Sequence, residues 1–204
     1  MLWIAVTAPH FFEGEAGFIG RLLAHGIDIV HLRKPGAREE DCARLLDNLS
    51  AEERSRIVIH DFFELVRPYS LRGIHLNARR NEIPAGYTGH VSRSCHSFGE
   101  IIRYKPVCTY LFLSPIFDSI SKHGYTAAFD EDTLRKAAGE GIIDNKVIAL
   151  GGVTPEKAGL LRSIGFGGGA MLGCIERLAS LPVREQIKAL ENRKEEPFHS
   201  VLKE

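Results

Sequence analysis

The sequence predicts an α/β fold, a single-domain (β/α)8 TIM barrel in which eight parallel strands close into a ring inside a layer of helices. Three observations support this fold: short apolar runs recur eight times, amphipathic segments separate most of them, and 204 residues suit one such domain. Some runs are continuously apolar, as in Val147–Leu150, which is typical of a strand covered on both faces. An open, doubly wound sheet is the alternative.

The expected strands follow one another at fairly regular intervals along the chain. A glycine stands where several of the intervening helices should stop, for example Gly26 and Gly165. The expected strands are Leu2–Thr7, Ile27–Arg33, Arg56–Asp61, Gly73–Leu76, His90–Ser94, Cys108–Ser114, Lys146–Gly151 and Phe166–Met171.

The expected helices carry apolar residues three and four positions apart, so that one face of each is apolar. Between Asn77 and Thr88, Pro84 and Gly86 predict a short or missing helix. We expect one barrel domain over residues 1–190, followed by a charged, frayed tail over residues 191–204. The expected helices are Ala16–Ala24, Asp41–Leu49, Phe98–Tyr104, Asp130–Ala138 and Pro155–Ile164, with a last one after Pro182.

The composition indicates which kinds of binding partner and which cellular location to expect. Lys+Arg and Asp+Glu number 26 each, which argues against nucleic acid or an anionic membrane as the main partner. Neither a basic signal region nor an apolar stretch of roughly 20 residues is present. The four widely spaced cysteines favour reduced thiols over disulfides or a zinc cage. We therefore expect a cytoplasmic protein that acts on small molecules, and the sequence leaves a homodimer open.

Polar side chains follow the ends of most expected strands. In a barrel the active site lies at the carboxyl ends of the strands, so these side chains should meet at one mouth. Cations, hydroxyls and glycines together suit an anionic, phosphorylated ligand. The candidates are His31, Arg33, Lys34, His60, Asp61, His75, Asn77, Arg93, Ser94, His96, Ser119, Ser121, Lys122, Gly151, Gly152 and Gly173.

The glycines after the last two strands indicate where a phosphate would bind. Gly151 and Gly152 follow the seventh expected strand, and Gly173 follows the eighth. The loops after these two strands form the recurring phosphate site of such barrels, where backbone N–H groups and a helix N-terminus favour an anion. The alternative is that these glycines only make tight turns and allow helices to pack.

Six segments in order resemble the motifs of one family. They are HLRKP, IVIHDFFELV, GIHL, SRSCHS, LFLSPIFDSISKHG and VIALGGVTPE. They resemble the QLRxK, VIND, GVHLG, GxSxHS, GPxFxTxTK and IAIGGITPE motifs of the thiamine phosphate synthase/TenI family. Each segment alone is weakly specific, but the resemblance is collinear from about residue 2 to residue 180.

The resemblance to the synthases implies a set of roles. These enzymes join a hydroxymethylpyrimidine diphosphate to thiazole phosphate with release of diphosphate, usually with Mg2+. By resemblance, Arg33 and Lys122 would hold the diphosphate, and Asp61 would be a magnesium ligand. Ser94 would contact the pyrimidine, while His31, Lys34 and His60 complete the predicted substrate-binding set at the mouth. The thiazole phosphate would be held by Ser119, Ser121, Gly151, Gly152 and Gly173.

The sequence departs from the synthase pattern at the metal site. The family's second magnesium carboxylate lies in a GQED segment, which here reads Asn77-Ala78-Arg79-Arg80. An arginine cannot bind a cation, although it could donate hydrogen bonds to a diphosphate. His60 stands in place of the family's asparagine, and Pro35 in place of its lysine.

The TenI branch also lacks the acidic pair and needs no metal. Its RSVHS segment with a catalytic histidine resembles Arg93–Ser97, which makes His96 the candidate base for an aromatising tautomerisation of a thiazole carboxylate phosphate. A thiazole tautomerase without cofactor is therefore slightly favoured, with a Mg2+-dependent synthase and a non-catalytic thiazole or thiamine phosphate binder as alternatives. We expect the loop Pro115–Thr126 to order over a bound ligand.

Overall fold

The computed structural model describes residues 1–118 and 128–191. Its strands form a closed, all-parallel barrel in chain order, and β8 pairs with β1. The predicted barrel is therefore confirmed, and the open-sheet alternative is wrong. The strands are β1 (Leu2–Val6), β2 (Ile29–Leu32), β3 (Ile57–Ile59), β4 (Gly73–Leu76), β5 (His90–Cys95), β6 (Tyr110–Leu113), β7 (Val147–Leu150) and β8 (Gly168–Met171).

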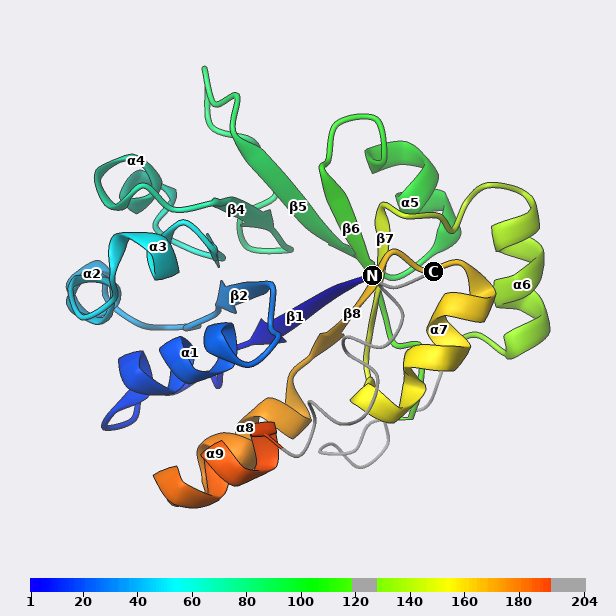
Figure 1. The fold of residues 1–204 in the computed structure, drawn as a ribbon. Coiled ribbons are helices and arrows are strands. Elements are labelled where there is room, and N and C mark those ends of the chain that lie inside the picture. Colours follow the sequence, from blue (N-terminus) through cyan, green and yellow to red (C-terminus); the bar gives the residue numbers. More distant parts are fainter. Residues whose placement is uncertain (119–127, 192–204) are drawn as a thin grey trace.

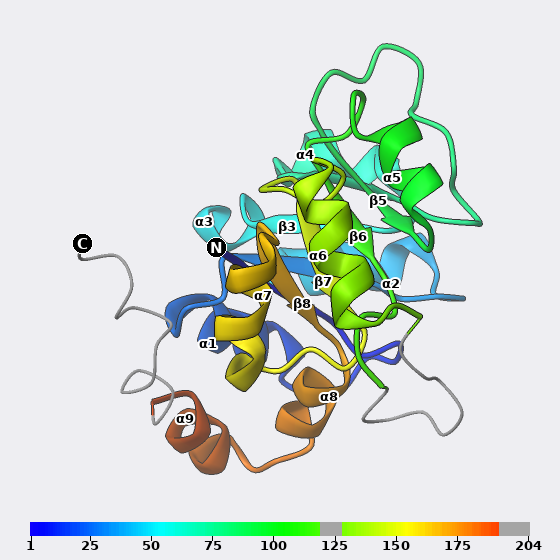
Figure 2. The same ribbon diagram turned by 90° about the vertical axis from the view of Figure 1, so that its right-hand side faces the viewer.

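The helices lie around the strands in chain order (Figure 1). They are α1 (Glu15–Ala24), α2 (Glu39–Asp47), α3 (Ala51–Arg54), α4 (Val66–Tyr69), α5 (Phe98–Tyr104), α6 (Glu131–Gly139), α7 (Ala158–Ile164), α8 (Gly173–Ala179) and α9 (Val183–Glu191), with 3₁₀ turns at Phe63–Leu65 and Pro155–Lys157. Residues 77–89, between β4 and β5, form turns without a helix, as expected. Figure 2 shows α8 and α9 together below α7.

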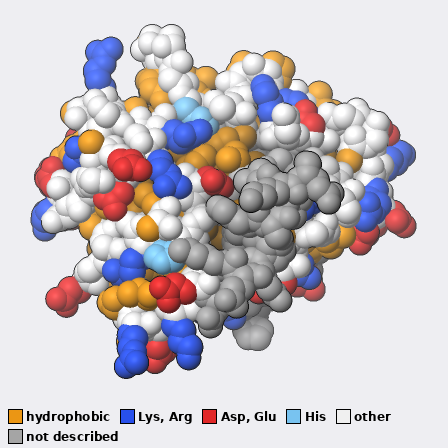
Figure 3. Space-filling view, viewed as in Figure 1, with side chains coloured by type: hydrophobic (Ala, Val, Ile, Leu, Met, Phe, Trp, Pro, Cys, Tyr) orange, Lys and Arg blue, Asp and Glu red, His pale blue; other side chains and the backbone are white. Residues whose placement is uncertain are grey.

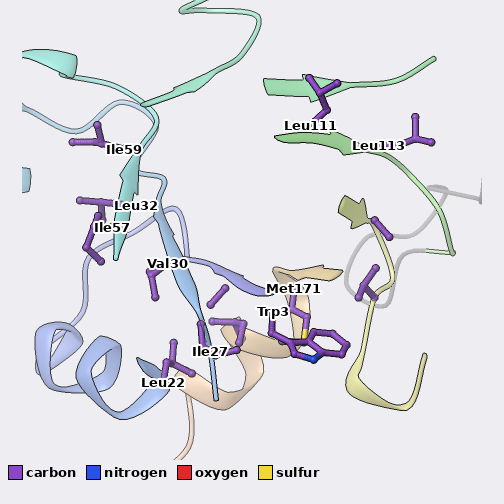
Figure 4. Packing of buried hydrophobic residues seen from close by; sticks show 14 of the residues in the cluster. Trp3, Leu22, Ile27, Val30, Leu32, Ile57, Ile59, Leu111, Leu113 and Met171 are labelled. Carbon is purple, nitrogen blue, oxygen red and sulfur yellow. The ribbon is translucent and has the colours of Figure 1, made fainter. Parts of the chain in front are cut away.

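Two hydrophobic cores follow from the alternation of side chains along each strand. The outer core lies between strands and helices and includes Trp3, Leu22 and Leu111 (Figure 4). The inner core fills the barrel with side chains from six strands, among them Ile4, Phe112 and Ile148. Full burial of a side chain of this size contributes about 1.5–3 kcal/mol, so both cores are needed to hold the strands in register.

One side of the barrel interior is polar rather than aliphatic. His31 on β2, His75 on β4 and Ser92 on β5 are all fully buried, and Tyr110 on β6 is 3% exposed. His60, which directly follows β3, is 5% exposed. These side chains lie on successive strands, so the register of the sheet brings them together beneath the carboxyl-end mouth.

Helix length and surface charge can both be judged in the described part of the chain. No helix within it combines the length and apolar character needed to cross a bilayer. On the face shown in Figure 3, acidic and basic side chains of the described residues are interspersed. This mixture agrees with the equal numbers of acidic and basic residues in the chain.

Candidate functional site

The structure brings the predicted phosphate-binding glycines to one rim. Strands β7 and β8 are paired, with Leu150 opposite Ala170, so Gly151, Gly152 and Gly173 follow neighbouring strand ends. The Cys174 thiol lies 3.9 Å from the Val153 carbonyl oxygen, which places the two loops in contact. Gly173 is the first residue of α8, so the amino-terminal end of that helix lies at this rim.

Gly152 is required by the backbone. Gly151 and Gly152 have φ angles of 92° and 61°, in the region that favours glycine. A Cβ at Gly152 would overlap the Asp118 carbonyl oxygen and lie 2.8 Å from the Phe117 Cβ. The Phe117 N–H donates to the Gly151 carbonyl at 3.0 Å. The glycine pair therefore allows the segment after β6 to lie directly on the β7 loop.

Replacing Gly152 by alanine is expected to destabilise the protein by about 1–3 kcal/mol, because a left-handed backbone and a steric overlap are both imposed on a side chain. Urea unfolding measures the change. The control is Gly159→Ala in α7, where a Cβ would meet nothing within 4 Å and helix propensity favours alanine. Equal stability of Gly152→Ala and wild type would contradict this account of the loop.

His96, the predicted base, follows β5 and is exposed. Its Nδ1 lies 3.1 Å from the Ser114 carbonyl oxygen. The Ser114 hydroxyl oxygen lies 3.2 Å from the same nitrogen. In the tautomer that donates from Nδ1 to the carbonyl, Nε2 carries the lone pair. The His96 N–H donates to Glu100 Oε2 at 2.6 Å, which fixes the backbone at the start of α5. The two Ser114 oxygens thus hold the Nδ1 edge of the His96 ring.

Asp61, the predicted magnesium ligand, is ion-paired. Arg79 Nη2 donates to Asp61 Oδ2 at 3.1 Å. Asn77 holds the segment in this position, because its Oδ1 accepts from the Arg79 N–H at 2.9 Å and its Nδ2 donates to the His60 carbonyl at 3.1 Å.

This donor set does not fit a magnesium ion. Mg2+ prefers oxygen ligands, commonly one or two carboxylates, and a guanidinium beside Asp61 competes with a cation. The pairing with Arg79 therefore argues against magnesium at Asp61.

A hydrogen-bonded chain of side chains occupies the polar side of the barrel. His31 Nδ1 lies 2.9 Å from His60 Nε2, and His31 Nε2 lies 2.6 Å from the Tyr110 hydroxyl. His75 Nδ1 lies 2.9 Å from Ser92 Oγ, and its Nε2 lies 2.8 Å from Ser94 Oγ. The half-buried Ser94 connects this cluster to the mouth, because it belongs to the carboxyl end of β5.

Burial keeps these imidazoles neutral. Desolvation, with smaller contributions from neighbouring positive charges, lowers the pKa of His31 and His60 well below the usual value. The same causes lower the pKa of His75 to about 3 and that of His90 to about 4. Desolvation also raises the pKa of Tyr110, so its hydroxyl stays protonated.

Acidification from pH 7.5 to 5.5 is therefore expected to destabilise the protein. In the unfolded chain these histidines take up protons near pH 6.5, whereas in the folded chain they stay neutral to much lower pH. Stability is thus fully present above that pH and falls below it, by up to about 1.4 kcal/mol per pH unit for each such histidine. Urea unfolding at the two pH values measures this, and His90→Phe should reduce the slope. A stability that rises on acidification would contradict the neutral cluster.

Lys34 is not positioned to bind substrate, and its predicted role needs correction. Its Nζ donates to Glu15 Oε1 at 2.6 Å, to the Ala8 carbonyl at 2.9 Å and to the His10 carbonyl at 2.8 Å. All three N–H donors of the ammonium group are used in this way. Lys34 is also 2% exposed, so it anchors the segment between β1 and α1.

The remaining predicted residues fall into two groups. Arg33, directly after β2, lies close enough to His60 for its positive charge to lower the pKa of that ring, as Arg79 does. Ser119, Ser121 and Lys122 lie outside the described residues, as does most of the loop expected to order over a ligand.

The sequence analysis did not single out Tyr110, Ser92 and Ser114. Alternation of side chains along β5 and β6 places Ser92 and Tyr110 inside the barrel.

Comparison with known proteins identifies the family to which this chain belongs. A family model described as thiamine monophosphate synthase matches residues 4–175. A solved thiamine phosphate pyrophosphorylase from Bacteroides thetaiotaomicron is 37% identical, with 95% of this chain and 99% of that chain covered and a TM-score of 0.80. The pyrophosphorylase from Pyrococcus furiosus is 17% identical, with 96% of each chain covered and a TM-score of 0.70, a likeness of fold. No match was found among curated proteins.

Proposed function

Because this chain belongs to the thiamine monophosphate synthase family, we propose that it is a thiazole tautomerase of the TenI type. The observation that carries the proposal is the pairing of Asp61 with Arg79, since a synthase of this family uses that carboxylate for magnesium. A tautomerisation needs a positioned base and an anion site and requires no metal. The proposed substrate is a thiazole carboxylate phosphate.

The residues would divide the work as follows. Backbone N–H groups at Gly151, Gly152 and Gly173 would hold the phosphate, assisted by the first turn of α8. In the tautomer that donates from Nδ1 to the Ser114 carbonyl, His96 would accept the substrate proton at Nε2 and return it to the atom that carries it in the aromatic product. Arg33 would stabilise the negative charge of the substrate from the β2 end of the mouth, and Lys122 stays a predicted phosphate contact.

The second candidate is a working synthase. It is favoured by the 37% identity to a protein named thiamine phosphate pyrophosphorylase. In that case Arg33 and Arg79 would bind diphosphate directly as charge-assisted donors. A protein that binds thiazole phosphate without turnover is the third candidate. For all three we propose a cytoplasmic location, which suits the free thiols of Cys42, Cys95 and Cys108.

A coupling assay separates the first two candidates. Purified protein is given hydroxymethylpyrimidine diphosphate and thiazole phosphate, with and without Mg2+, and thiamine phosphate is measured. We expect no enzymatic turnover in either condition. Turnover that depends on Mg2+ would overturn the tautomerase proposal in favour of a synthase, and Asp61→Asn should then abolish it.

A further inference from the structure

We propose that His31, His60 and His75 form a binding site for a divalent transition-metal ion of the zinc class, an inference that does not depend on the proposed function. Each residue offers one ring nitrogen, and these three atoms lie within 4.8 Å of one another. They are the one such group of three among the described residues, and all three side chains are buried.

Two of the nitrogens lie slightly closer together than a metal would hold them. Zinc binds imidazole at about 2.0–2.1 Å, so two nitrogens of a tetrahedral site lie roughly 3.3 Å apart. His31 Nδ1 and His60 Nε2 are separated by 2.9 Å. His75 must move further, because its ring is stacked on that of His60, with centroids 4.2 Å apart. Metal binding therefore replaces the His31–His60 hydrogen bond and turns the His75 ring out of the stack.

Neighbouring hydroxyls provide outer partners for two of the three proposed ligands, His31 and His75. A ligating imidazole normally donates its other N–H to an oxygen, which orients the ring. His31 Nε2 lies 2.6 Å from the Tyr110 hydroxyl, and His75 Nδ1 lies 2.9 Å from Ser92 Oγ. The structure therefore assigns His31 Nδ1, His60 Nε2 and His75 Nε2 as ligands, and His75 gives up its bond to Ser94.

The donor type selects the ion. Three imidazoles suit Zn2+ and neighbouring transition metals, whereas Mg2+ prefers oxygen ligands. Three protein ligands also leave a coordination position for water or an anion. The charges of Arg33 and Arg79 act on His60 and oppose a cation there.

Calorimetric titration of the full chain with Zn2+, after treatment with a chelator, tests the site. The expected result is one ion per chain, with binding lost in His31→Ala and in His60→Ala. Tyr110→Phe keeps the aromatic ring and removes only the hydroxyl that partners His31, so it should weaken binding by about 10–100-fold. Circular dichroism shows whether each variant is folded. If the alanine variants are unfolded, the Zn2+ affinity of Tyr110→Phe tests the site.

The control is His25→Ala, because His25 lies after α1 and is absent from the cluster. It should bind Zn2+ as wild type does. A Co2+ titration followed by its visible absorption should give the same stoichiometry. Saturable binding that is unchanged in His60→Ala and Tyr110→Phe, or no saturable binding to wild type, would overturn the proposal and leave the histidines as a hydrogen-bonded cluster.

Discussion

Replacing His96 by asparagine is expected to lower kcat/KM for the proposed tautomerisation by about 10²–10⁴-fold. Asparagine can still donate a hydrogen bond to the Ser114 carbonyl, so the loop after β5 should keep its conformation. What it lacks is the basic Nε2. Because phosphate binding would rest on the glycine loops, KM should change far less than kcat. Steady-state kinetics on the thiazole carboxylate phosphate measures both parameters.

His25→Asn is the matched control for this variant. His25 Nδ1 also contacts a backbone carbonyl, that of Arg21, at 2.7 Å, but it lies after α1 rather than at the mouth. The control should retain wild-type activity. If His96→Asn retained wild-type kcat as well, His96 would not be the base, and the role given to its tautomer would be wrong.

Replacing Lys34 by methionine is expected to destabilise the protein by about 3–5 kcal/mol, which is the usual cost of leaving a buried charge without its partner. Glu15 is 3% exposed, and its Oε2 already lacks a hydrogen-bond partner. Loss of the Lys34 ammonium therefore leaves Glu15 without its counter-ion, and two backbone carbonyls lose a donor. Urea unfolding at pH 7.5 measures the effect.

A second substitution should reverse much of this loss. In Lys34→Met/Glu15→Leu neither charge is buried, and such replacements often recover the stability of a buried ion pair. Arg38→Met is the control. Arg38 pairs with Asp41 at the surface, and loss of such a pair should change the free energy of unfolding little. A Lys34→Met variant within about 1 kcal/mol of wild type would contradict the role of Lys34 as an anchor.

Most of the fold could be predicted because it depends on local patterns. The eight apolar runs correspond to the strands, and Pro84 and Gly86 correctly indicated the missing helix after β4. Boundaries were less accurate. The helix expected over Pro155–Ile164 is divided into a 3₁₀ turn and α7, because the helix ends are decided by packing and capping rather than by the apolar period.

The positions of site residues could be predicted where they follow the end of a strand. They could not be predicted where they depend on contacts with residues far away in the sequence. His96, Asp61 and the glycines lie at strand ends, so the fold alone places them. Lys34 has the same position, but Glu15, 19 residues earlier, holds it below the surface. His31 and Tyr110 are 79 residues apart, and only the register of β2 through β6 brings them into contact.

We propose, above all, that this barrel uses a histidine base, without magnesium, to isomerise a thiazole carboxylate phosphate. The most direct measurement is the rate of aromatisation of that substrate by the purified wild-type protein, with no added metal and then with excess Mg2+. We predict a large acceleration over the uncatalysed rate that is the same in both conditions. A rate equal to the uncatalysed one, or an acceleration that appears only with Mg2+, would contradict the claim.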